Sequence, residues 1–217
     1  MNWDWEFIWD ILPQLARGAV VTFELTALGT LIAMTFGLIL AIMRRSPFRP
    51  VSALTGAFIE FVRSTPLLVQ ALLFFYVLPN FGILFPPFIT GMLAVGIHYS
   101  TYTAEVYRAG IEGVPSGQWE AATALNLPSS RVWLAVVLPQ AIRRVIPALG
   151  NYVISMVKEI PLLLAIGVLG VAGIANQIAS DTFRYVIPYT LAGIFFLLFS
   201  LVAARAVRML ERRLGHY

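Results

Sequence analysis

The sequence predicts an all-α integral membrane protein that crosses the bilayer five times. Hydrophobic residues make up 59% of the 217-residue chain and charged residues only 12%, which leaves too little polar surface for a water-soluble globule. A mean hydropathy of +0.81 agrees with this conclusion. Because each span needs about 20 apolar residues, the length allows about five helices with their connections and no separate soluble domain. We therefore expect residues 1–217 to form one transmembrane domain.

The first element is a predicted interfacial helix over residues 1–17. Trp3, Trp5 and Trp9 lie there among acidic residues, and indole rings prefer the boundary between membrane and water. No basic residue precedes Arg17, so the segment lacks the basic start of a signal peptide. We expect it to lie on the membrane surface.

Five apolar stretches follow as predicted spans. The fourth is less uniform than the others, because Asn151, Lys158, Glu159 and Pro161 interrupt it. Residues 171–185 are too polar to span and are expected to form a short outer helix. The predicted spans cover residues about 18–43, 51–79, 87–107, 145–171 and 187–207.

The distribution of arginine predicts the orientation. Basic residues concentrate on the cytoplasmic side of membrane proteins. With five spans, the side opposite the main arginine clusters receives only two arginines, Arg17 and Arg184, together with the acidic residues Asp4, Glu6, Asp10 and Asp181. The N-terminus is therefore expected outside and the C-terminus in the cytoplasm. The eleven arginines on the predicted cytoplasmic side are Arg44, Arg45, Arg49, Arg108, Arg131, Arg143, Arg144, Arg205, Arg208, Arg212 and Arg213.

Residues 110–144 form a polar, arginine-bearing segment on the predicted cytoplasmic side. Strong helix formers follow Pro115, and Ser116 is a candidate N-cap. This helix should stop near Asn126, since Asn tolerates the left-handed conformation and Pro128 cannot continue the helical pattern. The sequence therefore predicts a helix that ends in a tight bend.

A second cytoplasmic helix is expected over residues 131–140, capped by Ser129 or Ser130. The two helices would form a hairpin whose first helix exposes Trp119 and small residues, which let a partner approach closely. An ordinary amphipathic loop without a partner is the alternative that the hairpin alone leaves open.

Charged residues inside the predicted spans need partners, because insertion of each costs about 2.5–3.5 kcal/mol. Glu60 and Arg63 are three residues apart and can neutralise each other on one helix face. Lys158 and Glu159 are adjacent and point in different directions, so each needs a partner on another helix or a water-filled path. A predicted translocation path or gate includes Glu60, Arg63, Tyr99, Tyr102, Asn151, Lys158 and Glu159.

This mixed-sign set would suit a zwitterionic solute. The alternatives are a structural ion pair for Glu60 with Arg63, bridges between helices for Lys158 and Glu159, and hydrogen bonds between helices for the tyrosine-rich patch.

The sequence predicts no catalysis by the chain itself. The only lysine, Lys158, is not part of a glycine-rich phosphate loop, so ATP chemistry would reside on another polypeptide. No Ser/His/Asp arrangement is present, and two histidines, His98 and His216, without any cysteine cannot build a metal site. We expect no catalytic residue, no metal and no cofactor. Nucleic-acid binding is not expected, because the arginines lie at span ends as topology requires.

The cytoplasmic segment resembles the EAA loop of ABC-importer permeases. In that family a helix with Glu-Ala-Ala precedes a bend, an apolar run and two prolines. This chain departs from the pattern at Asn126, where Gly is usual, and the tolerance of Asn for the left-handed conformation accounts for the substitution. The matching residues are Glu120, Ala121, Ala122, Leu138, Pro139, Pro147 and Asn151.

Two further stretches resemble the polar amino acid uptake subfamily, which includes permeases of the histidine, glutamate, glutamine and arginine type. Residues 60–70, EFVRSTPLLVQ, are similar to its second-span signature. Residues 105–111, EVYRAGI, are similar to its approach to the EAA loop. A member of the subfamily for a compatible solute such as ectoine is also consistent with these motifs.

The resemblance implies a type I ABC importer permease fold in the bacterial inner membrane, surrounded by membrane lipid. It also implies a second permease chain, identical or related, two cytoplasmic ATP-binding subunits and an extracellular or periplasmic solute-binding protein. The residues that it assigns to coupling with the ATPase are Glu120, Ala121, Ala122, Leu125 and Asn126.

Two other functions compete with import by an ABC transporter. An ion-coupled secondary transporter would explain Glu60, Glu105, Lys158 and Glu159, but five spans without an inverted repeat argue against it. A non-transporting membrane scaffold is the third possibility.

Overall fold

The computed structural model of this chain describes residues 4–214, and every regular element in that range is helical. This confirms the predicted all-α class. The elements are α1 (Trp5–Arg44), α2 (Arg49–Arg63), α3 (Leu67–Leu72), a π-helical segment (Leu73–Val77), a 3-10 turn (Leu78–Phe81), α4 (Pro87–Glu112), α5 (Ser116–Ala124), α6 (Ser129–Arg131), a second π-helical segment (Val132–Val137), α7 (Leu138–Glu159), a second 3-10 segment (Ile160–Ile166), α8 (Val171–Thr182) and α9 (Val186–Leu214).

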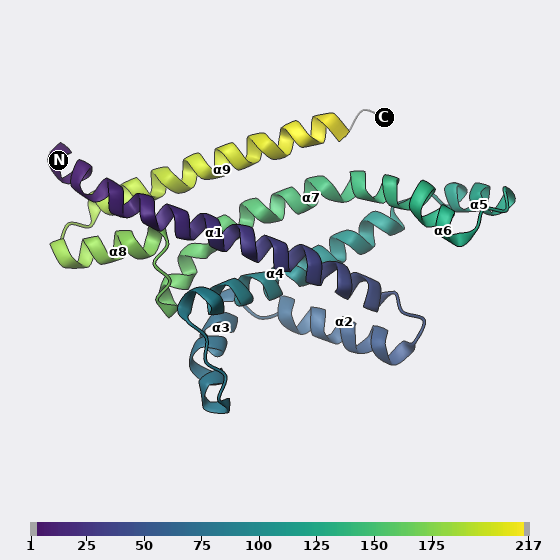
Figure 1. Cartoon of the computed structure of the whole chain (residues 1–217), viewed down its shortest axis with the longest axis horizontal. Coiled ribbons are helices and arrows are strands. Elements are labelled where there is room, and N and C mark those ends of the chain that lie inside the picture. Colours follow the sequence, from purple (N-terminus) through teal and green to yellow (C-terminus); the bar gives the residue numbers. More distant parts are fainter. Residues whose placement is uncertain (1–3, 215–217) are drawn as a thin grey trace.

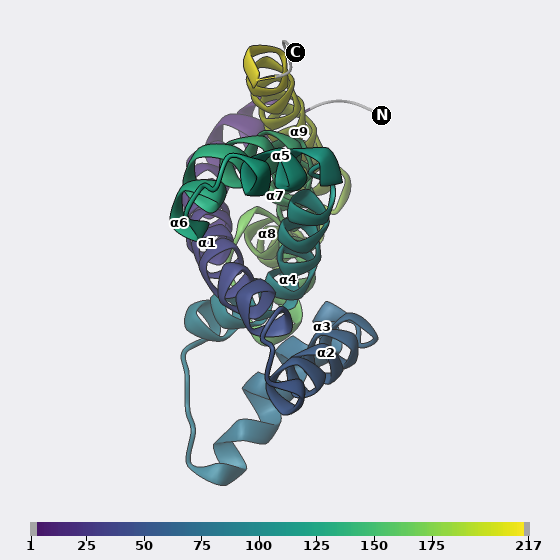
Figure 2. The ribbon, with the colours of Figure 1, turned by 90° about the vertical axis from the view of Figure 1, so that its right-hand side faces the viewer.

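The long helices run along the longest axis of the molecule (Figure 1). α1 packs along α4, and α7 packs against both α4 and α9. α8 lies at one end of the bundle, beside the start of α1, whereas α5 and α6 lie at the opposite end (Figure 1). We name these the α8 end and the α5 end. The segment Leu67–Phe81, the lateral arm, projects sideways from the bundle (Figures 1 and 2).

Three helical segments are long and apolar enough to cross a membrane, namely Trp5–Arg44, Ser129–Ile166 and Val186–Arg213. A fourth results if α2 and the lateral arm together count as one broken span, since they meet at an angle of 101°. The predicted span 51–79 is therefore bent sharply near its middle. The count of five spans and the outside position of the N-terminus stay predictions.

α1 differs from the prediction because it is one continuous helix of 40 residues, without a boundary near residue 17. Its first turns expose Trp5 and Trp9 on one face, and the interfacial position of these turns stays a prediction. Ile11 and Leu15 pack against Val171 and Ile178 of α8, so protein covers their face and gives the helix no reason to turn away. Residues 1–3 of the predicted interfacial segment lie outside the described part of the chain.

Asp4 fixes the start of α1 and ties it to the loop between α8 and α9. The carboxylate accepts a hydrogen bond from the Phe7 backbone N–H at 3.0 Å and another from Arg184 Nη1 at 2.7 Å. These two donors, the Phe7 amide first, lower the pKa of Asp4 below its ordinary value of 3.8. Aspartate is a preferred N-cap because it satisfies an amide that has no partner inside the helix.

α4 has enough residues for a span but is more polar than the three apolar segments, and many of its polar side chains are buried against other helices. Thr103 donates to the carbonyl oxygen of Ala33 in α1 at 2.6 Å. The two backbones approach closely here, since a Cβ at Gly37 would meet the Ser100 carbonyl oxygen at 2.7 Å. The buried core around this contact contains Leu25, Ala33, Leu67, Ala71, Ala94, Val95, Tyr99, Met156, Ile160, Leu163, Ile166 and Val168.

The predicted second cytoplasmic helix is not a separate element, because Ser129–Ile166 runs as one helical segment through a π-helical stretch. Beyond Glu159 the helix tightens to the 3-10 form, with Pro161 near its start. It ends at Gly167, whose φ of 83° only glycine adopts easily. This end precedes the predicted limit of the fourth span at residue 171. A short helix is present where one was predicted, as α8, and its outer position stays a prediction.

Candidate translocation cavities and coupling helix

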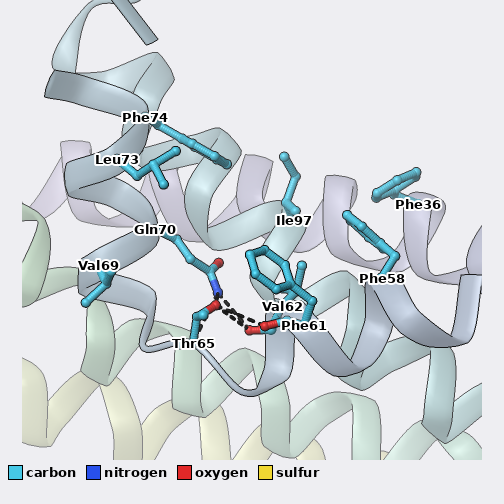
Figure 3. Close-up of a pocket in the computed structure, with 10 residues that line it drawn as sticks. All are labelled: Phe36, Phe58, Phe61, Val62, Thr65, Val69, Gln70, Leu73, Phe74 and Ile97. Atoms are coloured by element: carbon cyan, nitrogen blue, oxygen red, sulfur yellow. Dashed lines mark hydrogen bonds between the residues drawn. The ribbon is translucent and has the colours of Figure 1, made fainter. Parts of the chain in front are cut away.

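The break between α2 and α3 is the feature that creates the candidate site. α2 ends at Arg63, and Pro66 then adopts an extended conformation before α3 begins. Proline has no backbone N–H and disfavours helical geometry in the residue before it, so Thr65-Pro66 is a natural breaking point. The side chain of Gln70 crosses the break and bonds to both sides of it (Figure 3).

A cavity of about 380 Å³, the central cavity, opens beside this break. It brings together residues from α2, α4 and the end of α7. Arg63, Tyr102 and Glu159, three of the predicted path residues, lie in its wall. The full lining is Arg63, Ser64, Thr65, Pro66, Leu67, Leu68, His98, Tyr102, Glu159 and Leu162.

A second cavity of about 490 Å³ adjoins the first. The two share Arg63, Ser64 and Tyr102, so together they form a continuous polar region along α2 and α4. The predicted path residue Glu60 lies in this second cavity, together with Glu105. Its lining is Arg44, Gly56, Ile59, Glu60, Arg63, Ser64, Tyr102 and Glu105.

The predicted ion pair between Glu60 and Arg63 is wrong. The ion pairs found between side chains of residues 4–214 do not include it. Arg63 is the last residue of α2, and its guanidinium instead lies over the ring of Tyr102, 5.0 Å from the centroid. The planar cation is attracted by the negative face of the ring, so it faces α4 and the cavities. Glu105 pairs with Arg108 at 2.7 Å on its own helix.

Glu159 carries the most unusual electrostatic feature of the region. Its Oε2 is the one buried side-chain oxygen or nitrogen in the described residues that has no hydrogen-bond partner. A carboxylate oxygen buried in this way costs free energy unless a donor or a cation reaches it. Glu159 also lines the central cavity, and its carboxylate interacts with the buried Tyr99 of α4.

Aromatic rings pack against one side of the central cavity. The rings of Tyr99, Tyr102 and Tyr152 lie within 6.0 Å of one another, centroid to centroid, and His98 lies 5.2 Å from Tyr102. Tyr99 itself is buried, whereas Tyr102 reaches the cavity. The neighbouring hydroxyl groups of Ser100, Thr101 and Thr103 line neither cavity, and each donates to a backbone carbonyl oxygen.

Asn151 and Lys158 do not line either cavity. They are seven residues apart, which places them on one face of α7, and both are exposed. Lys158 and Glu159 thus point in different directions, as adjacent residues on a helix do.

α5 contains the predicted coupling residues and lies at the tip of the α5 end (Figure 1). Glu120 and Ala121 are exposed, and Leu125 is 72% exposed although it is a large apolar residue. Ala122 is buried and faces the hairpin, so it cannot contact a partner directly. Trp119 anchors the helix by packing edge-to-face on Trp133 at 5.4 Å.

Both predicted serine caps differ from the structure. Ser116 and Ser129 are instead the first residues of their helices. The N-cap positions belong to Pro115 and Pro128, which make no side-chain hydrogen bond. An extended proline sets the entry angle here instead of a hydroxyl group.

The predicted bend at Asn126 is confirmed, because this residue has a φ of 52°. The N–H of Leu127 donates to the carbonyl oxygen of Ala122 at 3.1 Å, which closes the end of α5. Local chemistry therefore decides this turn, as the sequence indicated.

Substitution of Asn126 tests the bend. Asn126→Gly is expected to preserve thermal stability, whereas Asn126→Val should destabilise the protein by about 1–2 kcal/mol, because a β-branched side chain clashes in the left-handed conformation. Thermal unfolding of the purified protein measures the difference. Equal stability of the two variants would show that the backbone conformation at this position does not matter.

The sequence prediction missed two residues of this region, His98 and Gln70. His98 lies in the wall of the central cavity, and Gln70 bonds across the break. Both are polar residues within otherwise apolar stretches, and polar residues inside a membrane protein are usually functional. That signal could have identified them.

The chain matches a family model described as a binding-protein-dependent transport system inner membrane component, over residues 33–216. A probable amino-acid ABC transporter permease protein of Sinorhizobium fredii is 42% identical over 210 residues, which are 97% of this chain and 91% of the relative. The glutamine transport system permease protein of Escherichia coli is 31% identical over 216 residues, 99% of both chains.

Solved structures agree with these relatives. A chain in the crystal structure of an amino acid ABC transporter with histidines has a TM-score of 0.93 and 36% identity, and the match covers 98% of this chain and 100% of that one. A chain of an inward-facing methionine ABC transporter has a TM-score of 0.79, with 94% and 98% of the two chains covered. At 16% identity the second match shows the fold alone.

These matches confirm the resemblance to ABC-importer permeases, the type I permease fold and the place in the membrane. They extend over nearly the whole chain and include both the cavities and the α5 hairpin. The chain therefore belongs to the family of binding-protein-dependent transport system inner membrane components, and it is the permease subunit of an ABC transporter.

Proposed function

We propose that this permease imports an amino acid or an amino-acid-derived zwitterion, driven by ATP, and that the solute passes through the central cavity. The observation that carries the proposal is the presence of opposite charges, Arg63 and Glu159, in one cavity wall, where Glu159 Oε2 makes no hydrogen bond. The cavity volume of about 380 Å³ lies in the range of small-molecule sites.

The chemistry of an amino acid fits this arrangement. Its ammonium group has three N–H donors and can satisfy the carboxylate of Glu159, while its carboxylate can accept hydrogen bonds from the Arg63 guanidinium. The ring of Tyr102 holds the guanidinium in place, so the cation is oriented before the solute enters. Uncharged solutes or simple ions would leave one of the two charges without a partner.

The relatives support the same solute class. Their names include permeases for glutamine, arginine and cystine, and a matching structure is of an amino acid transporter with histidines. Members of this permease family belong to binding-protein-dependent transport systems. We infer that an external solute-binding protein delivers the solute and contributes to the choice among amino acids and compatible solutes.

The same proposal assigns energy coupling to α5. We infer that two permease chains, identical or related, associate with two cytoplasmic ATP-binding subunits, and that α5 inserts into a groove of each. Exposed Glu120, Ala121 and Leu125 provide the contact, and Asn126 ends the helix. Movement of the groove would carry α5 and the continuous helix Ser129–Ile166 with it, and so change access to the central cavity. In this orientation the α5 end faces the cytoplasm.

Uptake by the reconstituted transporter tests the proposed function. The permease, its ATP-binding subunits and its binding protein are placed in proteoliposomes and given radiolabelled glutamine, arginine, histidine, cystine and ectoine. We expect uptake of at least one solute that requires ATP and continues when an ionophore collapses the membrane potential. Uptake that needs the potential and not ATP would indicate a secondary transporter. Absence of flux for every solute would indicate a scaffold.

A further inference from the structure

The side-chain amide of Gln70 makes several hydrogen bonds across the α2–α3 break (Figure 3). The two N–H groups of its Nε2 are shared among three acceptors: the Val62 carbonyl oxygen at 2.8 Å, the Thr65 carbonyl oxygen at 3.0 Å and Thr65 Oγ1 at 2.7 Å. Its Oε1 lies 3.3 Å from Nδ1 of His98 in α4. One amide thus contacts the end of α2, the break itself and a third helix.

The break leaves backbone carbonyl groups that need donors. Carbonyl groups at the end of α2 lose helical partners where the chain turns, and Pro66 brings no N–H to replace them. The N–H and the hydroxyl group of Thr65 donate to the Val62 carbonyl oxygen at 3.3 and 3.1 Å, and the amide of Gln70 adds a shorter bond of 2.8 Å from the other side of the break. Gln70 lies one turn into α3, which is the position from which its amide reaches back over the break.

The lateral arm depends on this attachment because much of its surface is uncovered. It projects from the bundle (Figures 1 and 2), and its inner face contacts α4, the segment after α7 and the buried core, for example through Leu67, Ala71 and Phe74. A hinge with few contacts on one side is easily displaced unless specific bonds hold it. The large exposed side chains of the arm are Val69, Leu73, Tyr76, Val77 and Phe81.

His98 connects the same amide to the central cavity. Because Nε2 of Gln70 faces three oxygens, the orientation of the amide is fixed, and its Oε1 can only accept a hydrogen bond. The imidazole must then donate from Nδ1, and its neutral form keeps Nε2 as an acceptor. His98 also lines the central cavity and contacts the ring of Tyr102. A solute that contacts His98 would therefore also affect the hydrogen bond between His98 and Gln70.

We propose that Gln70 is a positioning residue for transport: its amide holds the α2–α3 break in the bent form, and its contact with His98 makes the bend respond to occupancy of the central cavity. The second half of this inference rests on the proposed function, because it needs a solute in the cavity. The first half concerns the empty permease and does not. Gln70 itself does not line the central cavity, so its effect on the solute passes through the break and His98.

Hydrogen exchange of the purified transporter, with the full permease chain in its complex, tests the first half. In Gln70→Glu the side chain keeps its shape and an acceptor toward His98 but loses the N–H donors. We expect backbone amides of residues 64–70 to exchange about tenfold faster in this variant, as for the loss of one to two net hydrogen bonds. Amides of α8 should keep their rates. The matched control is Gln177→Glu, the same change at an exposed position of α8, which should leave residues 64–70 unaffected.

Unchanged exchange of residues 64–70 in Gln70→Glu would overturn the inference, and so would equal acceleration throughout the chain, which indicates general destabilisation. Thr65→Val provides a second test if Gln70→Glu does not assemble, because it removes one of the acceptors and leaves Gln70 in place. In Thr65→Val the backbone amides of residues 64–70 should exchange faster than in the natural protein, but by a smaller factor than in Gln70→Glu. Unchanged hydrogen exchange of residues 64–70 in Thr65→Val would also contradict the proposal that Gln70 holds the break.

Transport kinetics test the second half. With radiolabelled glutamine, arginine, histidine and cystine as probes, we expect the maximal uptake rate of Gln70→Glu to fall about tenfold and solute affinity to change less than about threefold. A bound solute should slow exchange of residues 64–70 in the natural protein but not in the variant. Equal losses of rate and affinity would make Gln70 a binding residue and overturn the positioning role. Failure of the natural protein to transport any probe would contradict the proposed function alone, because exchange in the empty permease still decides whether Gln70 holds the break.

Discussion

The substitution Glu159→Gln is expected to lower the affinity of the central cavity for its amino acid by at least about thirtyfold, because loss of one partner of a buried charge pair costs about 2–5 kcal/mol. The neutral amide keeps the size of the side chain but cannot attract an ammonium group as a carboxylate does. Equilibrium binding of radiolabelled amino acids to the purified complex, without the binding protein, measures the effect. ATP-driven uptake should fall in parallel.

Thermal stability separates this role from a structural bridge between helices. The empty Glu159→Gln complex is expected to be as stable as the natural one or more stable. Oε2 makes no hydrogen bond, an amide oxygen still accepts from the neighbouring Tyr99 hydroxyl, and a buried amide costs less than a buried carboxylate. A structural ion pair would instead predict a lower melting temperature. Glu159→Asp keeps the charge and should restore part of the affinity, and Glu6→Gln, an exposed change at the α8 end, should have no effect. Full affinity in Glu159→Gln would contradict the proposed solute site.

The substitution Glu120→Lys is expected to release the ATP-binding subunits from the permease and so to abolish ATP-driven uptake. Glu120 is exposed on α5, and Leu125 at the end of this helix is 72% exposed. A charge reversal in a small interface both removes a favourable contact and places a like charge or an unpaired charge there. Such changes weaken association by about thirtyfold or more. Copurification of the ATP-binding subunit with tagged permease measures the association.

The control for this experiment is Glu6→Lys, which makes the same charge reversal at the exposed start of α1, at the opposite end of the molecule. It should copurify the ATP-binding subunit as the natural chain does. Solute binding in the central cavity should survive in Glu120→Lys, because α5 does not line the cavity. If Glu120→Lys retained both the ATP-binding subunit and uptake, α5 would not be the coupling helix.

The bend after α5 shows what could be predicted from sequence. Asn126 and Pro128 limit the backbone at their own positions, so the prediction of a left-handed residue needed no knowledge of the rest of the fold. The φ of 52° at Asn126 confirms it. Serine caps, in contrast, were expected from average preferences, and the prolines before Ser116 and Ser129 took those positions instead.

The pairing of charges could not be predicted in the same way. Glu60 and Arg63 have the spacing of a helical ion pair, but α2 ends at Arg63 and the ring of Tyr102 lies within reach. Spacing along one helix gives the possible local partners, and a competing group from another helix decides between them. For the same reason Lys158 and Glu159, which are adjacent in sequence, have different surroundings.

The sequence by itself determined the membrane location, the helical class and the hairpin with its bend, because these follow from composition, apolar length and the backbone limits of single residues. Only the tertiary structure decided that the predicted span over residues 51–79 bends by 101° and that the amide of Gln70 bonds across the break. It also decided that Glu159 lines the central cavity and that its buried Oε2 makes no hydrogen bond. The physical reason is that these features depend on the rotation and distance of helices far apart in sequence, which packing of the whole chain fixes.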